Sequence, residues 1–380
     1  MSNAKDQNKN GRGQRSRGGL LGGISLNSLS TNIDLVRKFM RLTDWKALHD
    51  EVQGEMRRTV AIVGMPNTGK STLFNTLRGR HSSAVSPVAG TTTTPIRGAF
   101  GPFNLIDTPG HLRGVQLDAV DESAVVLLLL DASRGLRPED HDLLHELRRT
   151  GKPLVVALNK IDALTRDPDH VAGEYAAQLS IQDIIPISAA VGTNVGEELV
   201  PALIDASPEA ALAIGLALPG YRRTAADRMV RNATLVGLAA GMEPIPLLDI
   251  PILLGNQIRL VLRIAAVYGE PMTIQHMREL GTTIAAGLAL RYVAEEAAKL
   301  VPIGGDLVSG LIAAAGTWAI GQVAIEYFEG GKRLSRRQLN EMFSRYYRRY
   351  RQDSGAREVG QLAPALQGAL PPPSLEREQR

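Results

Sequence analysis

The segment TVAIVGMPNTGKSTLFNTL, residues 59–77, constrains the fold of this chain more than any other part of its sequence. A short apolar run ends at Val63, the pattern G-x-x-x-x-G-K-S occupies residues 64–71, and a helix-forming sequence follows. Glycines in such a loop let the backbone approach phosphate oxygens, while N–H groups and the helix N-terminus supply positive potential. The pattern and its flanks therefore predict a strand, a phosphate-binding loop and a helix, and they disfavour a turn without function.

Individual residues of this loop have predicted roles. The Lys70 ammonium adds a full positive charge at the β- and γ-phosphates of a nucleotide, and the Ser71 hydroxyl is a ligand for Mg²⁺. The motif alone does not separate ATP from GTP. The residues that we expect to contact the nucleotide are Gly64, Pro66, Asn67, Thr68, Gly69, Lys70, Ser71 and Thr72.

Residues 59–206 alternate short apolar runs with loops and helical stretches. The runs include FNLID, AVVLLLLDA, PLVVALN and IIPIS. They are too short for helices and too continuous for strands with one wet face, which is typical of buried parallel strands joined by crossover helices. The predicted fold class is α/β, with a doubly wound, mostly parallel sheet followed by an all-α region.

Two motifs downstream of the phosphate loop predict a switch. The sequence DTPG, residues 107–110, follows the apolar run FNLI. Asp107 at a strand end can hold Mg²⁺ through water, and the Gly110 N–H can bond a γ-phosphate and be released once that phosphate leaves. A threonine cluster at 91–94 lies between the two motifs, and one of its hydroxyls can complete the Mg²⁺ shell.

Two later motifs predict a guanine-binding pocket. The sequence NKID follows the apolar run PLVVAL, and SAA follows IIPI. A carboxylate at Asp162 can accept hydrogen bonds from guanine N1–H and the exocyclic amino group, whereas adenine presents a bare acceptor at N1. The motifs therefore favour GTP over ATP. The base-binding residues are Asn159, which can brace the loop, Lys160, whose stem can cover the base, Asp162, Ser188, and Ala189, whose N–H can bond guanine O6.

Composition excludes several kinds of site and predicts which segments outside the α/β region are disordered or helical. There is no cysteine, which excludes a disulfide scaffold, a thiol nucleophile and a zinc–thiolate site. Basic ends flank an acidic middle, which argues against one uniform nucleic-acid surface. Residues 1–22 and the Pro-rich 353–380 are predicted to be disordered, and apolar spacing from Leu35 to Met56 predicts one amphipathic helix within 23–58.

Residues 207–330 change to long helical stretches rich in Ala, Leu and Gly. Within them, Leu307–Ile325 is 19 residues long without a charge, nearly enough to span a bilayer. Its glycines and its glutamine make insertion marginal. Together with the shorter stretch 280–290 it also fits a buried helical hairpin. The sequence leaves both open, including a hairpin that packs in the domain and docks on lipid when the switch changes state.

A basic, aromatic helix is predicted at 331–352. One face carries Leu339, Met342, Phe343, Tyr346 and Tyr350, and the remainder is rich in arginine. This composition suits an anionic lipid interface. Unpaired RNA is the competing partner, because arginine and tyrosine also stack on bases. A solvated basic helix is the third interpretation.

The ordered motifs of residues 59–206 resemble those of the Era-like branch of the translation-factor class of small GTPases. The resemblance implies a six-stranded, mostly parallel sheet and Mg²⁺-dependent hydrolysis of GTP to GDP and phosphate. It implies that Thr92 is the switch threonine and binds Mg²⁺ together with Ser71 and Asp107. Thr93 and Thr94 stand where the closest relatives have an Arg-Asp pair, which is a departure from the family pattern.

The resemblance raises two further hypotheses. His111 follows DTPG where Era-like members have an apolar residue and translation factors have histidine. Its imidazole can orient the attacking water, so His111 joins Lys70 and Thr92 as a candidate catalytic residue; an exposed histidine without a role is the alternative. Asn67 matches the position at which several relatives bind potassium, which makes K⁺ activation the second hypothesis.

Spaced proline, glycine and tyrosine residues between about 213 and 330 resemble the helical domain of YcjF-type membrane-associated GTPases. This resemblance implies membrane association. The sequence as a whole predicts a GTP-driven switch at the cytoplasmic face of a membrane, attached peripherally or by shallow insertion. The alternatives are a ribosome-assembly GTPase that binds RNA, and a membrane-remodelling GTPase that self-associates on bilayers.

Overall fold

The computed structural model describes residues 38, 41–85, 101–106, 119–242, 249–279, 281 and 305–353. The predicted disordered tails, apart from Asp353, and nearly all of the apolar stretch 280–290 lie outside these residues. The elements named below belong to one unit, which is formed by Asp44–Thr282 and Gly304–Arg380.

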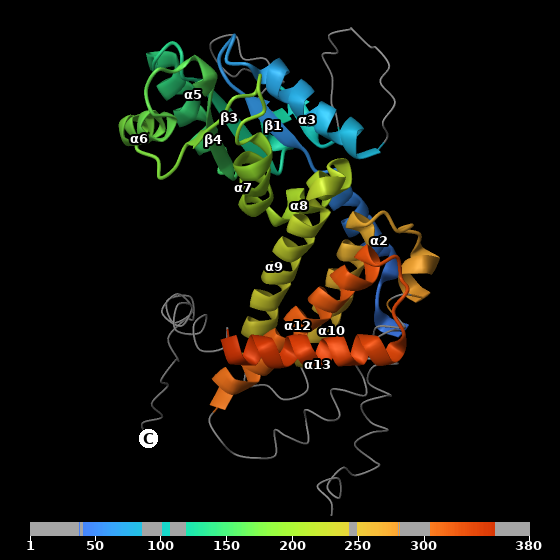
Figure 1. Cartoon of the computed structure of the whole chain (residues 1–380). Helices are drawn as coiled ribbons and strands as arrows, with labels where there is room; N and C mark the ends of the chain where they lie inside the picture. The colour runs from blue at the N-terminus through green and yellow to red at the C-terminus, as the bar shows by residue number, and fades with distance from the viewer. Residues whose placement is uncertain are drawn as a thin grey trace, which may run out of the picture. The chain divides into compact units, whose positions relative to one another are not determined.

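Five parallel strands form a sheet in the order β2-β1-β3-β4-β5 (Figure 1). Their bounds are β1 Val60–Val63, β2 Phe103–Leu105, β3 Val125–Asp131, β4 Leu154–Asn159 and β5 Ile185–Pro186. Val60 pairs with Val125, and Asp131 pairs with Asn159. Because all five strands are parallel, the loops that follow β1, β3 and β4 meet at one edge of the sheet. The α/β fold is as predicted, and the sixth strand implied by the family resemblance is not among the described residues.

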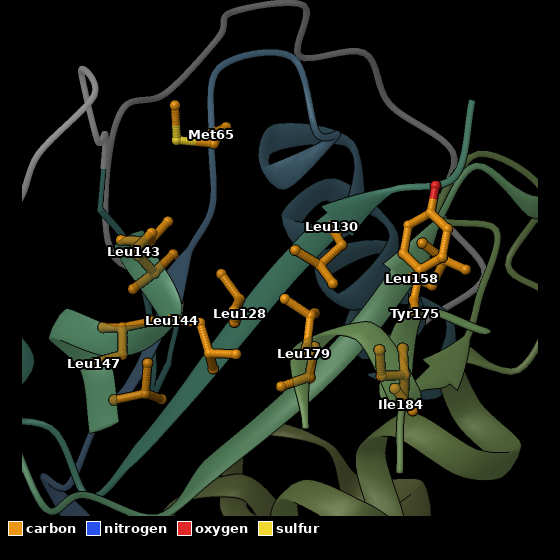
Figure 2. Close-up of a cluster of buried hydrophobic side chains, with 14 of the residues drawn as sticks. Met65, Leu128, Leu130, Leu143, Leu144, Leu147, Leu158, Tyr175, Leu179 and Ile184 are labelled. Carbon is orange, nitrogen blue, oxygen red and sulfur yellow. The ribbon is translucent and has the colours of Figure 1, made fainter. Parts of the chain in front are cut away.

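Helices cover both faces of this sheet, as the continuous apolar strands require. The helices described in the α/β domain are α3 Lys70–Val85, α5 Pro138–Arg149, α6 Pro168–Leu179 and α7 Val200–Ala206. Figure 2 shows Leu128 and Leu130 of β3 packing with leucines of α5 and with Tyr175 and Leu179 of α6. The alternate residues Leu127 and Leu129 are fully buried as well, so β3 has no wet face.

Six further described helices form a bundle. They are α2 Trp45–Met56, α8 Pro208–Ala217, α9 Arg222–Met242, α10 Asp249–Val267, α12 Gly305–Glu329 and α13 Arg336–Asp353. Ser207 separates α7 from α8; its hydroxyl accepts from the Ala210 N–H, and Pro208 occupies the first turn of α8. This is a common way to end one helix and begin another.

The single helix predicted from Leu35 to Met56 is wrong, because the helix ends before Asp44 and restarts at Trp45. One Asp44 carboxylate oxygen accepts from the N–H groups of Lys46 and Ala47, at 3.0 and 2.9 Å. A side chain that satisfies these orphan donors starts a new helix. The apolar spacing runs across the break, so periodicity alone could not reveal it.

Helix α2 packs against α8 and α10, although it precedes the α/β domain in the chain. Arg259 of α10 pairs with Glu51 at 2.9 Å, and Arg263 of α10 pairs with the largely buried Glu55 at 2.5 Å. Burial raises the pKa of Glu55 above its ordinary value, although the Arg263 guanidinium acts in the opposite direction. The α/β domain is therefore inserted between the first helix of the bundle and the rest of it.

Helix α12 is the single helix long and apolar enough to cross a membrane among the described residues. The qualifying window is Gly310–Glu329, and 67% of it is buried against other parts of the chain. Its neighbours are α9, α10 and α13. The predicted second arm of a buried hairpin lies within one continuous helix of 25 residues. Nearly all of the first arm, 280–290, lies outside the described residues.

Glycines allow α9 and α12 to approach closely. A Cβ added to Gly321 of α12 would overlap the side chain of Val230, and one added to Gly237 of α9 would lie 2.8 Å from the Thr317 hydroxyl oxygen. Positions of this kind tolerate no added methyl group without movement of the neighbouring helix.

We expect Gly321→Ala to destabilise the protein by about 1–2 kcal/mol, because overpacking against Val230 outweighs the gain in helix propensity. The matched control is Gly54→Ala in α2, where an added Cβ meets nothing within 4 Å; this change should stabilise by up to about 1 kcal/mol. Urea unfolding followed by circular dichroism measures both. Equal stability of the two variants would contradict the tight α9–α12 contact.

Candidate functional site

The phosphate-binding loop joins β1 to α3. A Cβ on Gly64 would lie 2.5 Å from the Leu129 carbonyl oxygen, and Gly69 has a φ of +96° with no room for a side chain beside the Asn159 amide. Both positions require glycine. The Thr68 hydroxyl donates to the Met65 carbonyl at 3.0 Å, which closes the loop on itself.

Lys70 begins α3, and its side chain turns back into the loop. The ammonium donates to the carbonyl oxygens of Gly64 at 2.6 Å and Met65 at 3.1 Å, and the residue is 9% exposed. The positive charge is therefore held inside the backbone loop that is predicted to surround a phosphate. Ser71 is exposed in the first turn of α3, where a hydroxyl ligand for a hard cation is accessible.

Asn159, the last residue of β4, links the phosphate loop to the loop after β5. Its amide Nδ2 donates to the Thr68 carbonyl at 2.8 Å, and its Oδ1 accepts from the Ala189 N–H at 2.8 Å. Asn159 is 2% exposed, so both bonds are formed away from solvent. This buried amide holds the predicted phosphate and base sites together.

The Ala189 N–H is therefore engaged by Asn159 in this structure, whereas the sequence predicts that it bonds guanine O6. The Ala189 carbonyl accepts from the Thr76 hydroxyl of α3 at 2.6 Å. The predicted base-binding loop is thus tied to the helix that follows the predicted phosphate loop. No sequence motif points to Thr76, because its role depends on packing between distant segments.

Asp162 and Ser188 lie together, as their predicted shared role requires. The Ser188 hydroxyl donates to Oδ1 of Asp162 at 2.5 Å and accepts from the Val191 N–H at 3.3 Å. Oδ2 of Asp162 accepts no hydrogen bond from the described residues, and the side chain is exposed. A base with two adjacent N–H donors can reach this carboxylate.

Lys160 adopts the left-handed conformation, with φ 68°, and its ammonium donates to Oδ2 of Asp131 at 2.7 Å. Burial acts to raise the pKa of Asp131, but hydrogen bonds from Lys160 and Ser133 outweigh it, so the pKa lies below its ordinary value. The resulting pair of opposite charges fixes the lysine stem beside the base site. Sequence reasoning missed Asp131, although a carboxylate that ends a buried strand next to β4 was an available signal.

The predicted switch residues are not among the described residues. Thr92, Asp107, Gly110 and His111 lie outside the described residues. Ser71 is therefore the single predicted Mg²⁺ ligand in the described part of the chain, and no cluster of three or more His, Asp or Glu side chains there could hold a metal. Asn67 is exposed with a φ of 65°, and Pro66 and Thr72 are also exposed.

We expect Asn159→Ala to weaken binding of GTP and GDP by about 30-fold, which corresponds to two lost hydrogen bonds at about 1 kcal/mol each. Asn75→Ala is the matched control, since Asn75 is exposed on α3. Fluorescent-nucleotide titration measures both variants, and thermal melting verifies that they fold. Wild-type affinity in a folded Asn159→Ala protein would contradict the bridging role.

Comparison with known proteins agrees with this geometry. Residues 59–160 match the family described as 50S ribosome-binding GTPase, and residues 216–352 match a domain of unknown function, DUF697. GTPase Der of Caldicellulosiruptor saccharolyticus is 38% identical over 159 residues, which are 38% of this chain and 36% of that protein. GTPase Der of Natranaerobius thermophilus is 37% identical over 168 residues, 40% of this chain and 37% of that protein.

Among solved structures, the FeoB G-domain from Methanococcus jannaschii is 26% identical over 39% of this chain and 96% of that one, with a TM-score of 0.27. The chain spans little more than a third of the length of the Der proteins that it matches. The matched segment contains the phosphate loop, the parallel strands β1 to β4 and Asn159. The family match and the parallel sheet together show a P-loop GTPase fold, which is followed by a helical region that is similar to DUF697.

Proposed function

We propose that this protein is a Mg²⁺-dependent, GTP-hydrolysing switch whose helical region attaches to an anionic membrane surface. The observation that supports it most is the Asn159 bridge, because it joins a phosphate loop to a carboxylate-bearing base loop. A site built in this way can recognise a purine and a polyphosphate at the same time.

In this proposal the loop N–H groups and the Lys70 ammonium hold the β- and γ-phosphates. Ser71, Thr92 and Asp107 would hold Mg²⁺, which when bound neutralises charge on the phosphate oxygens. His111 orients a water molecule that attacks the γ-phosphorus, and the bond to the bridging oxygen breaks to give GDP and phosphate. The loops that carry Thr92 and Gly110 are held by GTP and released after hydrolysis.

The decisive experiment compares binding and turnover of GTP and ATP. We expect a preference for GTP of at least about 100-fold, because Asp162 would face a lone pair on adenine, and loss of binding in Lys70→Ala. Parallel assays in NaCl and KCl test Asn67 as the potassium ligand, which predicts faster hydrolysis in KCl. Equal binding of ATP, or unchanged binding by Lys70→Ala, would overturn the proposed function.

His111→Ala should lower kcat for GTP at least about tenfold while leaving GTP affinity intact, since the imidazole acts on the attacking water and not on the bound nucleotide. The matched control is His141→Ala on the exposed surface of α5. Phosphate-release kinetics distinguish the two. Unchanged turnover of His111→Ala would leave His111 without a catalytic role.

The case for membrane attachment comes from α13. Its aromatic face packs inward, because Trp318 of α12 contacts the rings of Tyr346 and Tyr350 at centroid distances of 5.5 and 5.4 Å. The exposed surface of α13 carries Arg337, Arg345, Arg348, Arg349 and Arg351 together with Glu341. We therefore infer electrostatic attachment at the cytoplasmic face through the exposed arginines of α13, with its aromatic face and α12 remaining in the bundle.

Replacing Arg345, Arg348 and Arg349 together by glutamine should weaken binding to anionic vesicles about 100-fold, at about 1 kcal/mol for each charge near the surface. The control replaces Arg78, Arg137 and Arg149, which are exposed in the α/β domain. Flotation in low and high salt measures both proteins. Binding that survives the α13 changes would exclude this helix as the attachment surface.

A ribosome-associated function is the second candidate, because the family matched by residues 59–160 is described as ribosome-binding. Co-sedimentation with ribosomal particles, without flotation on vesicles, would favour it. The third candidate, assembly on membranes, predicts that turnover per molecule rises with protein concentration on vesicles. The three outcomes are separable in one set of purified components.

A further inference from the structure

A small groove lies between α9, α12 and α13. Its volume is about 210 Å³. Asp227, Arg231 and Leu235 line it from α9, Trp318 and Gln322 line it from α12, and Tyr350 lines it from α13. The groove is distant in sequence from every nucleotide motif, and the proposed GTPase chemistry makes no use of it.

One wall of the groove is aromatic. The Trp318 ring is half-buried and lies 5.4 Å from the Tyr350 ring, at an angle of 38°. Tyr346 meets the same indole edge to face, at 5.5 Å and 80°. These contacts fix the indole, whose electron-rich face is the best aromatic surface for a cation.

The part of the lining that comes from α9 carries one charge of each sign. Asp227 and Arg231 stand one turn apart on α9, which places their Cβ atoms roughly 5–6 Å from each other. Oδ1 of Asp227 accepts from the Gln322 amide at 3.0 Å, and Oδ2 accepts no hydrogen bond from the described residues. The Asp227 side chain is half-buried, so a cation beside it would be partly shielded from water.

Arg231 stands at the mouth of the groove. Its side chain is 59% exposed, and its Nη1 is 3.6 Å from Oδ1 of Asp205. The Nε of Arg228 lies at the same distance from that oxygen, so Asp205 keeps a partner if Arg231 turns to a ligand. Arg231 can therefore offer its guanidinium to an anion at little cost.

We propose that this groove binds a compact zwitterion of the aminoethyl phosphate class, with its ammonium between Asp227 and Trp318 and its phosphate on Arg231. Two carbons between the charged groups match the one-turn spacing of Asp227 and Arg231. The volume suits such a ligand, since a cavity of about 150 Å³ already admits benzene. A simple anion is disfavoured by Asp227, and a simple amine leaves Arg231 unused.

The same aminoethyl phosphate group occurs in free phosphoethanolamine and in the headgroup of phosphatidylethanolamine.

The experiment uses the full chain, whose two tryptophans, Trp45 and Trp318, are labelled as 5-fluorotryptophan. Trp45→Phe assigns the two ¹⁹F resonances. We expect phosphoethanolamine to shift the Trp318 resonance saturably and to leave the Trp45 resonance in place.

Two variants test the assigned contacts. Asp227→Asn retains an acceptor for Gln322 and should weaken both ethanolamine and phosphoethanolamine about tenfold or more, because the cation loses its counter-charge. Arg231→Gln should weaken phosphoethanolamine about tenfold and leave ethanolamine unchanged. Asp142→Asn and Arg149→Gln, on the exposed surface of α5, are the matched controls.

Vesicles distinguish the source of the ligand. A Trp318 shift with phosphatidylethanolamine vesicles alone identifies the lipid headgroup, and a shift with the free zwitterion identifies the soluble molecule. Absence of a Trp318 shift with either probe, at free zwitterion concentrations on the order of 10 mM, overturns the proposal. A shift of equal size in Asp227→Asn, or with phosphatidylglycerol vesicles, overturns it as well, because it then reports surface adsorption by α13.

Discussion

The candidate nucleotide site depends on one buried side chain, because Asn159 directly links the predicted phosphate loop to the loop that is predicted to face the base. Its amide has one donor group and one acceptor group directed to opposite sides, and each meets a backbone partner at 2.8 Å. An aspartate at this position would lack the donor, and an alanine would leave the Thr68 carbonyl and the Ala189 N–H unpaired in the interior. The parallel register sets Asn159 beside Asp131. It therefore places the ion pair between Lys160 and Asp131 at the same edge of the sheet as Asn159.

Much of the α/β domain could be predicted from local sequence. Strand β3 is apolar from Val125 to Leu130 and is buried on both sides, and Gly64 and Gly69 of the phosphate loop occupy positions where a side chain cannot fit. These features depend on a few neighbouring residues. The Thr76–Ala189 contact depends on residues 113 positions apart, and no local pattern encodes it.

The helical bundle was harder to predict. Amphipathic spacing identified α13, but it could not show whether the aromatic face contacts lipid or Trp318. Apolar and aromatic side chains are favourable in both environments. The apolar spacing between Leu35 and Met56 also continues across Asp44, where the helix is interrupted and a new one is capped. The assignment of α2 to the bundle follows from ion pairs between residues 208 positions apart, which only the folded chain reveals.

The insertion of the α/β domain between α2 and α8 has a mechanical consequence. Three residues, 57–59, separate α2 from β1, and on the return path Ser207 alone separates α7 from α8. Two connectors this short do not act as flexible linkers, so they restrict rotation of the α/β domain relative to the helices on either side of it. A change in the orientation of the α/β domain would therefore require movement at the ends of α2, α7 and α8, so a rearrangement driven by the proposed GTP hydrolysis would be transmitted directly to the bundle.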